Sequence, residues 1–261
     1  MAAMTPAEIV LETPEILAER VAHDFESLVG ETLKAQPRVT IALAGGQTPK
    51  LFYSRLAQEP FRSSIPWEKI WFFWGDERCV PQDHPESNFK MVSEALLAHV
   101  PVNPAHVFRM HGEDAPPQAA RDYEKLLRET FSGSDWPAFD LTLLGLGPDG
   151  HTASLMPGTP ALNFSGAPND RWVVGNVIRA MQTVRITLTL PAINHARHLW
   201  FLVTGAKKAA IYARVREGEN PDFPASLVHP ADGHVRWYLD KSVANRPSAE
   251  TAKTIPGQRQ S

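Results

Sequence analysis

Short apolar runs alternate with segments of helical periodicity along most of this chain, and this alternation limits the possible folds more than any other feature. RVTIALAGG is continuously apolar and rich in β-branched residues, which is typical of a strand buried on both faces. Thr48 and Pro49 then open a helical pattern through Leu56. KIWFFWGDER followed by SNFKMVSEALLAHV, with Ser87 as the helix cap, repeats the order. Strands alternating with helices predict an α/β fold, with a doubly wound, mostly parallel sheet flanked by helices.

The remaining segments extend this pattern to about residue 240. Thr13 and Pro14 begin a helical segment over 14–34, and further helices are expected near 116–131 and 206–217. Further strands are expected at DLTLLGLG, RWVVGNVI, RITLTLPAI, HLWFLVTG and VRWYLD. No shift of composition divides the chain, so residues 1–240 are expected to form a single α/β catalytic domain. Residues 241–261 are rich in Pro, Ser, Thr and Gln without apolar periodicity, which predicts a flexible C-terminal tail.

Charge and cysteine usage exclude several classes of protein. Lys and Arg number 26 against 29 acidic residues, giving a net charge of -3, so nothing draws the chain generally toward nucleic acid or an anionic membrane. The single cysteine, Cys79, excludes an internal disulfide framework and a multi-thiolate metal site. No secretory signal or run of membrane-spanning length is visible. We therefore expect a cytoplasmic protein, monomeric or a small homo-oligomer.

In an open parallel sheet, ligands bind beyond the carboxyl ends of the strands. AGGQTPK lies between a predicted strand and a predicted helix. Gly45 and Gly46 would let the backbone approach a ligand closely, and Thr48 offers a hydroxyl and a helix cap, so the turn could hold a phosphate. It matches neither the Walker nor the dinucleotide fingerprint. A plain strand-to-helix turn is the alternative.

A second strand end, WGDERCVPQDHPESN, carries Asp76, Glu77 and Arg78 together. Three charges at one strand end are unusual for purely structural reasons, although a solvated loop with internal ion pairs explains them too.

The third strand end is GLGPDGHTAS, in which Asp149 and His151 lie two residues apart within a tight, glycine-rich loop. A histidine held there can exchange protons near neutral pH; an ordinary loop histidine is the alternative. Asp-x-His supplies only two metal ligands and no third recurs at ligand spacing, so we expect no metal and no cofactor.

Two cations complete the candidate site. RITLTLPAIN places Arg185 at the start of a strand, and LVTGAKKAA places Lys207 at the beginning of a helix. A lysine in the first helical turn opposes the helix dipole, which favours an anionic partner. A flexible surface lysine is the alternative for either Lys207 or Lys208.

Five segments in order, AGGQTPK, WGDERCVPQDHPESN, LLGLGPDGHTASLMPG, RITLTLPAIN and VTGAKKA, resemble the 6-phosphogluconolactonase family over roughly residues 39–229. The resemblance implies a sugar-phosphate isomerase-like, Rossmann-type fold and hydrolysis of 6-phospho-D-glucono-1,5-lactone to 6-phospho-D-gluconate in the oxidative pentose phosphate pathway. It implies that His151 is catalytic, that Asp76 and Arg78 line the pocket, and that the phosphate lies near Gly45, Gly46, Thr48, Arg185 and Lys207. The glycine turn departs from the usual SGGSTP form at Ala44 and Gln47, which removes a hydroxyl at position 47 but leaves the backbone amides.

On this basis, His151 would act as a general base toward water and then return the proton to the ring oxygen. Asp149 would either orient the imidazole or brace the turn, and Arg78 or loop amides would stabilise the oxyanion. The related glucosamine-6-phosphate deaminases share the Asp-Gly-His loop, but their motif has a glutamate where this chain has Met156, which cannot act as an acid or base. A non-catalytic sugar-phosphate sensor on the same fold is the other alternative.

Overall fold

The computed structural model describes residues 6–167, 170–230 and 232–245, which form two sheets with flanking helices. The larger sheet has six parallel strands in the order β1-β9-β8-β5-β2-β3. These strands are β1 (Ala7–Leu11), β2 (Val39–Leu43), β3 (Ile70–Trp74), β5 (Leu141–Leu144), β8 (His198–Val203) and β9 (His234–Asp240). From β2 the chain continues to β3 on one side, whereas β5 lies on the other side. This reversal of strand order is where ligands bind in such sheets.

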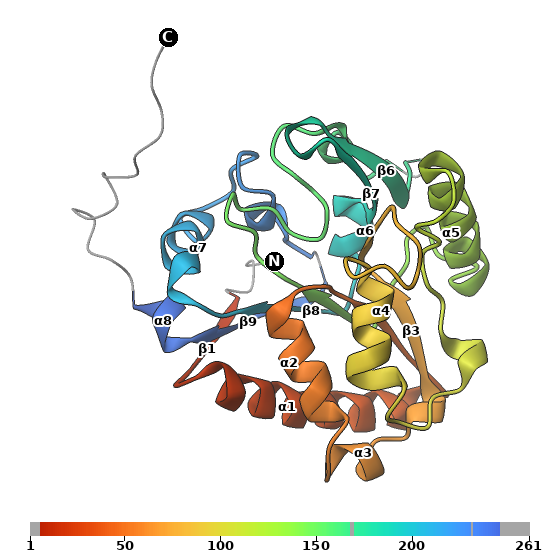
Figure 1. The fold of residues 1–261 in the computed structure, drawn as a ribbon, viewed down its shortest axis with the longest axis vertical. Coiled ribbons are helices and arrows are strands. Elements are labelled where there is room, and N and C mark those ends of the chain that lie inside the picture. Colours follow the sequence, from red (N-terminus) through yellow and green to blue (C-terminus); the bar gives the residue numbers. More distant parts are fainter. Residues whose placement is uncertain (1–5, 168–169, 231, 246–261) are drawn as a thin grey trace.

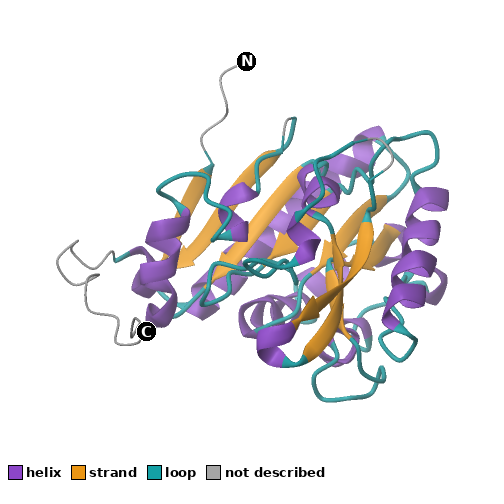
Figure 2. Cartoon of the chain, turned by 90° about the horizontal axis from the view of Figure 1, so that it is seen from above, coloured by secondary structure: helices purple, strands orange, loops and turns teal. Residues whose placement is uncertain are grey.

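Helices lie on both sides of this sheet (Figures 1 and 2). They are α1 (Pro14–Ala35), α2 (Gln47–Leu56), α3 (Phe61–Ser64), α4 (Asn88–Val92), α5 (Pro116–Thr130), α6 (Leu190–Asn194), α7 (Ala209–Val215) and α8 (Lys241–Ala244). Helix α1 packs on α2 and against the sheet, and it begins as the sequence predicts, because the side chain of Thr13 accepts a hydrogen bond from the N–H of Ile16. Ser87 caps α4 in the same way. The predicted α/β fold is confirmed.

The smaller sheet is antiparallel and was not expected. It contains β4 (Asp76–Arg78), β7 (Thr183–Leu188) and β6 (Val173–Ile178), in that order. Thus RWVVGNVI and RITLTLPAI do not belong to the parallel sheet, and Arg185 lies within β7 rather than at its start. The chain crosses between the sheets at Gly75, whose N–H donates to the carbonyl of Leu43 in β2 while its carbonyl accepts from the N–H of Leu188 at the end of β7. One residue therefore makes backbone hydrogen bonds to both sheets.

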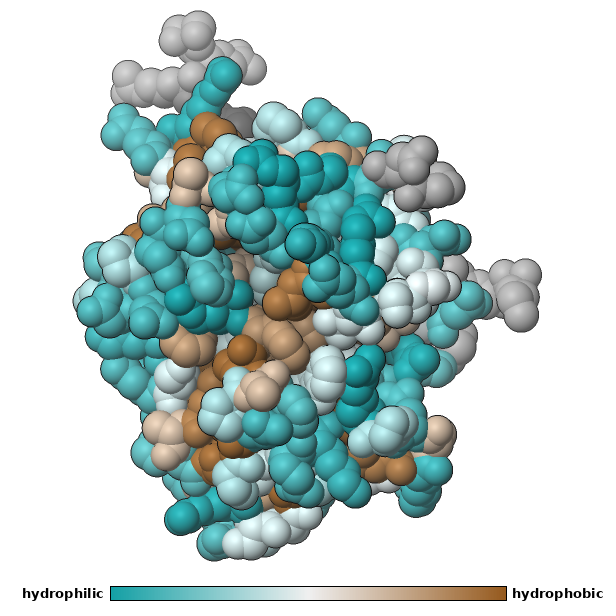
Figure 3. Space-filling model, turned by 90° about the vertical axis from the view of Figure 1, so that its right-hand side faces the viewer, coloured by the Kyte–Doolittle hydropathy of each residue, from teal (hydrophilic) through white to brown (hydrophobic). Residues whose placement is uncertain are grey.

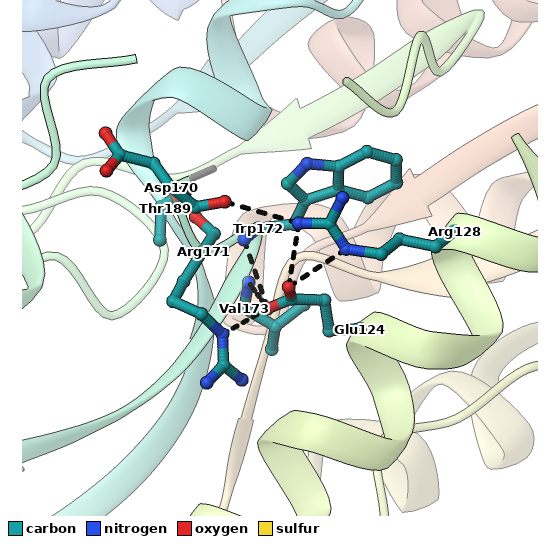
Figure 4. Close-up of polar contacts among 7 residues, drawn as sticks. All are labelled: Glu124, Arg128, Asp170, Arg171, Trp172, Val173 and Thr189. Atoms are coloured by element: carbon teal, nitrogen blue, oxygen red, sulfur yellow. Dashed lines mark hydrogen bonds and ion pairs between the residues drawn. The ribbon is translucent and has the colours of Figure 1, made fainter. Parts of the chain in front are cut away.

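A buried carboxylate ties the small sheet to helix α5 (Figure 4). Glu124, on α5, pairs with Arg128 one turn later at 2.9 Å and with Arg171 at 2.7 Å. It also accepts hydrogen bonds from the backbone N–H groups of Trp172 and Val173, where β6 begins. The Arg128 guanidinium lies 4.3 Å from the ring centroid of Trp172. This cluster holds the entry to β6 against α5.

The first residues of the predicted C-terminal tail are helical. Residues Lys241–Ala244 form α8, whose first turn is capped by the Asp240 carboxylate through the N–H of Val243, and Val243 is fully buried. A four-residue helix with a single buried residue has no periodicity to detect. The rest of the predicted tail, 246–261, lies outside the described residues. Strand β1, which the sequence pattern did not indicate, pairs with β9.

The face shown in Figure 3 is mainly polar, with a band of apolar side chains across it. Among the helices of the described residues, none is both long enough and apolar enough to cross a membrane.

Candidate active site

A cavity of about 370 Å³ lies at the carboxyl ends of the central parallel strands and is closed on one side by the small sheet. Its wall includes the turn after β2, the junction after β3, the loop after β5 and the end of β8. Seven of the residues expected in the site line it together: Gly45, Gly46, Thr48, Asp76, Arg78, His151 and Arg185. Segments far apart in the chain thus converge where the strand order reverses.

The glycine turn forms the start of α2. Gly46 is the N-cap of this helix with φ of 106°, a conformation that favours glycine. The prediction that Thr48 caps this helix is therefore wrong. The hydroxyl of Thr48 instead lies 2.7 Å from the hydroxyl of Thr204, which follows β8. Gly45 must lack a side chain for a steric reason, because a Cβ there would lie 2.0 Å from Oδ1 of Asn88. The free N–H groups of the first helical turn border the cavity and suit an anion.

Asp76 is buried and held from two sides. Its Oδ2 accepts a hydrogen bond from the hydroxyl of Ser154 at 2.6 Å, and its Oδ1 and backbone carbonyl both accept from the side-chain amide of Asn88. Ser154 is itself fixed, since its carbonyl accepts from Asn176 on β6. The carboxylate of Asp76 therefore has a defined orientation at the cavity wall.

Glu77, next along β4, serves the fold instead of the site. Its carboxylate accepts from the N–H groups of Arg78, Asn88 and Phe89 and thereby caps the start of α4. Burial raises the pKa of Glu77 above its ordinary value, although these N–H groups act in the opposite direction. Of the two alternatives for GDER, the pocket explains Asp76 and Arg78, and internal hydrogen bonding explains Glu77.

Arg78 and Arg185 are direct cross-strand partners on β4 and β7. Like charges in that position repel each other, and neither guanidinium has a carboxylate within ion-pair distance among the described residues. The Nε atoms of both are buried without a hydrogen-bond partner there. Burial and the charge of Arg78 lower the pKa of Arg185, while Asp76 and Glu86 oppose this shift. Two cations kept together, neither in an ion pair within the part of the chain that the structure describes, indicate that an anion binds here.

His151 also lines the cavity, and its side chain is partly exposed. Its Nδ1 is 2.5 Å from Oδ1 of Asp149, and its backbone N–H donates to the same oxygen. Asp149 therefore orients the imidazole, while Asp76 is engaged with Ser154 and Asn88. Partial burial raises the pKa of Asp149, but His151 and nearby backbone N–H groups outweigh it, so the pKa lies below its ordinary value. Asp149 itself does not line the cavity.

The loop geometry depends on Gly147. A Cβ at this position would lie 2.1 Å from Nδ1 of His151, so only glycine leaves room for the ring. The N–H of Gly147 donates to the carbonyl of His151 at 2.8 Å and closes the loop. Ala153, two residues after the histidine, has φ of 47°, a strained value for a residue with a side chain.

Of the two adjacent lysines, the sequence placed Lys207 in the site, and this expectation differs from the structure. Lys207 is exposed and does not line the cavity, whereas Lys208 does. Burial lowers the pKa of Lys208, and the charge of Asp149 opposes this shift. Sequence reasoning also missed Asn88 and Thr204 as lining residues. The SN pair after GDER was the available signal for Asn88; Thr204 had none beyond its place after a strand.

Comparisons with known proteins agree with this geometry. The model of a family described as glucosamine-6-phosphate isomerases/6-phosphogluconolactonase matches residues 12–237. A 6-phosphogluconolactonase of Synechocystis sp. is 41% identical over 246 residues, which cover 92% of this chain and 98% of the relative. The structure of a 6-phosphogluconolactonase from Trypanosoma brucei matches with a TM-score of 0.79 and 30% identity, over 93% of this chain and 98% of that one.

A 6-phosphogluconolactonase structure from Thermotoga maritima matches with a TM-score of 0.77 and 27% identity, over 91% of this chain and 100% of that one. The likeness therefore extends over nearly the whole of the described chain and includes both sheets that form the cavity. The chain belongs to the family of glucosamine-6-phosphate isomerases and 6-phosphogluconolactonases.

Proposed function

We propose that this chain hydrolyses 6-phospho-D-glucono-1,5-lactone to 6-phospho-D-gluconate, the hydrolytic step of the oxidative pentose phosphate pathway. The family and the relative with 41% identity support this reaction. The observation that carries the proposal is an imidazole that a carboxylate orients in a cavity which two arginines also line, neither of them in an ion pair among the described residues. A phosphorylated ester suits this combination, because its phosphate can bind the cations while its carbonyl lies within reach of the imidazole.

His151 acts as the general base. Because Nδ1 carries its proton toward Asp149, Nε2 is the atom left with a free lone pair, and it takes a proton from the water that attacks C1. The C1 carbonyl becomes a tetrahedral oxyanion, which Arg78 or backbone amides stabilise. When the intermediate collapses, the bond from C1 to the ring oxygen breaks, and the imidazolium returns the proton to that oxygen.

The phosphate lies at the other end of the substrate. Arg185, Lys208 and the N–H groups of the turn at Gly45 and Gly46 supply donors and positive charge there. Asp76, held by Ser154, accepts hydrogen bonds from sugar hydroxyls. Binding energy at this remote end positions the carbonyl beside His151.

The chemistry of the cavity disfavours the deaminase alternative. Met156, which stands where the deaminase motif has glutamate, is buried in the core and does not line the cavity. A thioether has no proton to transfer.

The single cysteine also fits a reducing compartment, and we propose a cytoplasmic location.

The test is a coupled assay in which lactone is generated in situ and 6-phosphogluconate is followed, with spontaneous hydrolysis subtracted. We expect the wild-type chain to accelerate hydrolysis and the His151→Ala variant to lose about a hundredfold or more of kcat. His99→Ala, an exposed histidine outside the cavity, is the control. Activity of His151→Ala within a few fold of the wild type would refute the assigned role. Binding of 6-phosphogluconate without turnover would favour a sensor, and ammonia release from glucosamine 6-phosphate would favour a deaminase.

A further inference from the structure

We propose that Phe223 is a positioning residue for catalysis: it braces the loop that presents Asp149 and His151 to the cavity. Phe223 comes from a segment about seventy residues downstream in the chain, and it does not line the cavity. Its role therefore rests on the proposed function, because it acts only through His151.

The first support is direct packing against Gly150, the residue between the aspartate and the histidine. A Cβ at Gly150 would lie 2.8 Å from Cδ1, 2.9 Å from Cβ and 3.0 Å from Cα of Phe223. The Phe223 side chain and backbone thus occupy the space beside the Gly150 Cα. Gly150 has φ of 83°, and its backbone needs an external support to stay there because glycine has many other conformations available.

A hydrogen bond fixes the same contact. The N–H of Ala225 donates to the carbonyl of Gly150 at 2.9 Å, so two backbone segments remote in sequence are joined at the catalytic loop. Phe223 is 8% exposed and Ala225 is 2% exposed. The loop therefore has the cavity on one side and a buried support on the other.

The supporting segment is itself closed by internal hydrogen bonds. The N–H of Asn220 donates to the hydroxyl of Ser226 at 2.8 Å, and that hydroxyl donates to the carbonyl of Asn220 at 3.0 Å. The N–H of Phe223 also donates to the carbonyl of Asn220. The turn over 220–226 therefore presents Phe223 in one fixed direction.

Helix α7 lies beside this support. The guanidinium of Arg214, on α7, lies 4.3 Å from the ring centroid of Phe223. The residue before this helix is Lys208, which lines the cavity. Lys208 lies close enough to Asp149 for their charges to interact, because the charge of Asp149 opposes the lowering of the Lys208 pKa by burial.

The chemical need for a brace follows from the composition of the loop. Gly145, Gly147 and Gly150 give the loop great conformational freedom. The imidazole must nevertheless lie within hydrogen-bond distance of the attacking water, and a misplacement of about 1 Å can cost about a hundredfold in rate. Phe223 contacts neither the phosphate end nor the cavity, so its removal should change kcat and leave KM almost unaffected.

The experiment compares Phe223→Ala, Phe223→Leu and a matched control. Leucine keeps a Cβ and Cδ atoms, which are the side-chain atoms nearest Gly150, whereas alanine keeps only Cβ. Phe61→Ala is the control, because Phe61 is fully buried, has the guanidinium of Arg55 at 4.6 Å from its ring centroid, and lies outside the cavity. Each variant is assayed on freshly generated lactone at a temperature well below its own unfolding midpoint.

We expect Phe223→Ala to lose about tenfold or more of kcat with KM within about twofold of the wild type, and Phe223→Leu to recover most of the loss. Phe61→Ala should keep the wild-type kcat despite its lost stability. The second readout needs no turnover: ¹⁵N shifts of the His151 ring report which nitrogen bears the proton. In the wild type Nδ1 should be protonated, and in Phe223→Ala the ring signals should broaden or average between tautomers.

Two outcomes distinguish a failure of the positioning role of Phe223 from a failure of the proposed lactonase function. If Phe223→Ala has the kcat of Phe61→Ala and the ring signals of the wild type, the positioning role is wrong while the lactonase function stands. If the wild type does not hydrolyse the lactone, but the ring signals still change in Phe223→Ala, the proposed function is wrong while the brace is supported.

Discussion

The Nδ1 atom of His151 lies 2.5 Å from Oδ1 of Asp149, and the backbone N–H of His151 donates to the same oxygen at 3.2 Å. One carboxylate oxygen therefore fixes both the ring and the backbone of the histidine. This double contact explains how the imidazole is held in place within a loop that contains three glycines.

Replacing Asp149 by asparagine should lower kcat by about a hundredfold, because an amide can stabilise the wrong tautomer of the imidazole. The pKa of Asp149 lies below its ordinary value, so the wild-type carboxylate is charged throughout the neutral range. Raising the pH to about 9, above the range in which histidines titrate, should not restore the variant. Rate profiles of Asp149→Asn and of the exposed Asp135→Asn test this, and recovery at high pH would contradict it.

The two adjacent lysines provide an internal comparison. Lys208 lines the cavity, whereas Lys207 is exposed and does not line it. Lys208→Ala should raise KM for the lactone by about tenfold while changing kcat little, because it removes a charge at the remote phosphate. Lys207→Ala should behave like the wild type. The opposite pattern in steady-state kinetics would restore the original expectation for Lys207.

Gly147→Ala should damage catalysis far more than folding. The new Cβ would lie 2.1 Å from Nδ1 of His151, so either the ring or the loop must move. We expect a loss of about a hundredfold in kcat. Gly30→Ala, within α1 and with no atom within 4 Å of the new Cβ, should keep full activity and gain about 0.5–1 kcal/mol of stability. Equal kinetics for the two variants would show that the loop tolerates the ring's displacement.

Glu124 should contribute strongly to stability. Its side chain is 9% exposed and neutralises Arg128 and Arg171, both near 40% exposed. Glu124→Ala removes this carboxylate and its bonds to the start of β6, which should cost about 2 kcal/mol of unfolding free energy, less than a fully buried pair because the arginines regain water. Glu129→Ala, on the same helix and 69% exposed, should cost less than about 0.5 kcal/mol in denaturant titrations. Similar losses would contradict the anchoring role of Glu124.

The thiol of Cys79 should be slow to alkylate. Burial, with a further contribution from Glu77, raises its pKa to about 11 from 9.0. At pH 9 about one in a hundred folded molecules would carry the thiolate, compared with half of unfolded ones, so iodoacetamide should react about fiftyfold more slowly in the native state. Rates with and without denaturant measure this ratio. A ratio near one would show that the thiol is freely ionised.

Local sequence patterns predicted much of this fold. The strand patterns before AGGQTPK, GDER and GLGPDGH correspond to β2, β3 and β5, and the caps at Thr13 and Ser87 stand where expected. These features depend on neighbours in the sequence. Because strand ends converge in a parallel sheet, the approximate composition of the site also followed.

The features that the sequence did not predict depend on contacts between distant parts of the chain or on very short elements. The pattern of RITLTLPAI identifies a strand but not its partner, so the small antiparallel sheet and the pairing of Arg78 with Arg185 were not predicted. Lys207 and Lys208 lie in one short 3₁₀ turn, where a single step changes a side chain's direction by about 120°. Phe223 meets Gly150 only through tertiary structure.

The chain passes from the parallel sheet into the small sheet at Gly75, and the cavity takes side chains from both parts: His151 and Lys208 follow β5 and β8, whereas Asp76, Arg78 and Arg185 lie on β4 and β7. A ligand that fills the cavity contacts groups of both sheets at once, so its binding should stabilise the packing of the two sheets against each other.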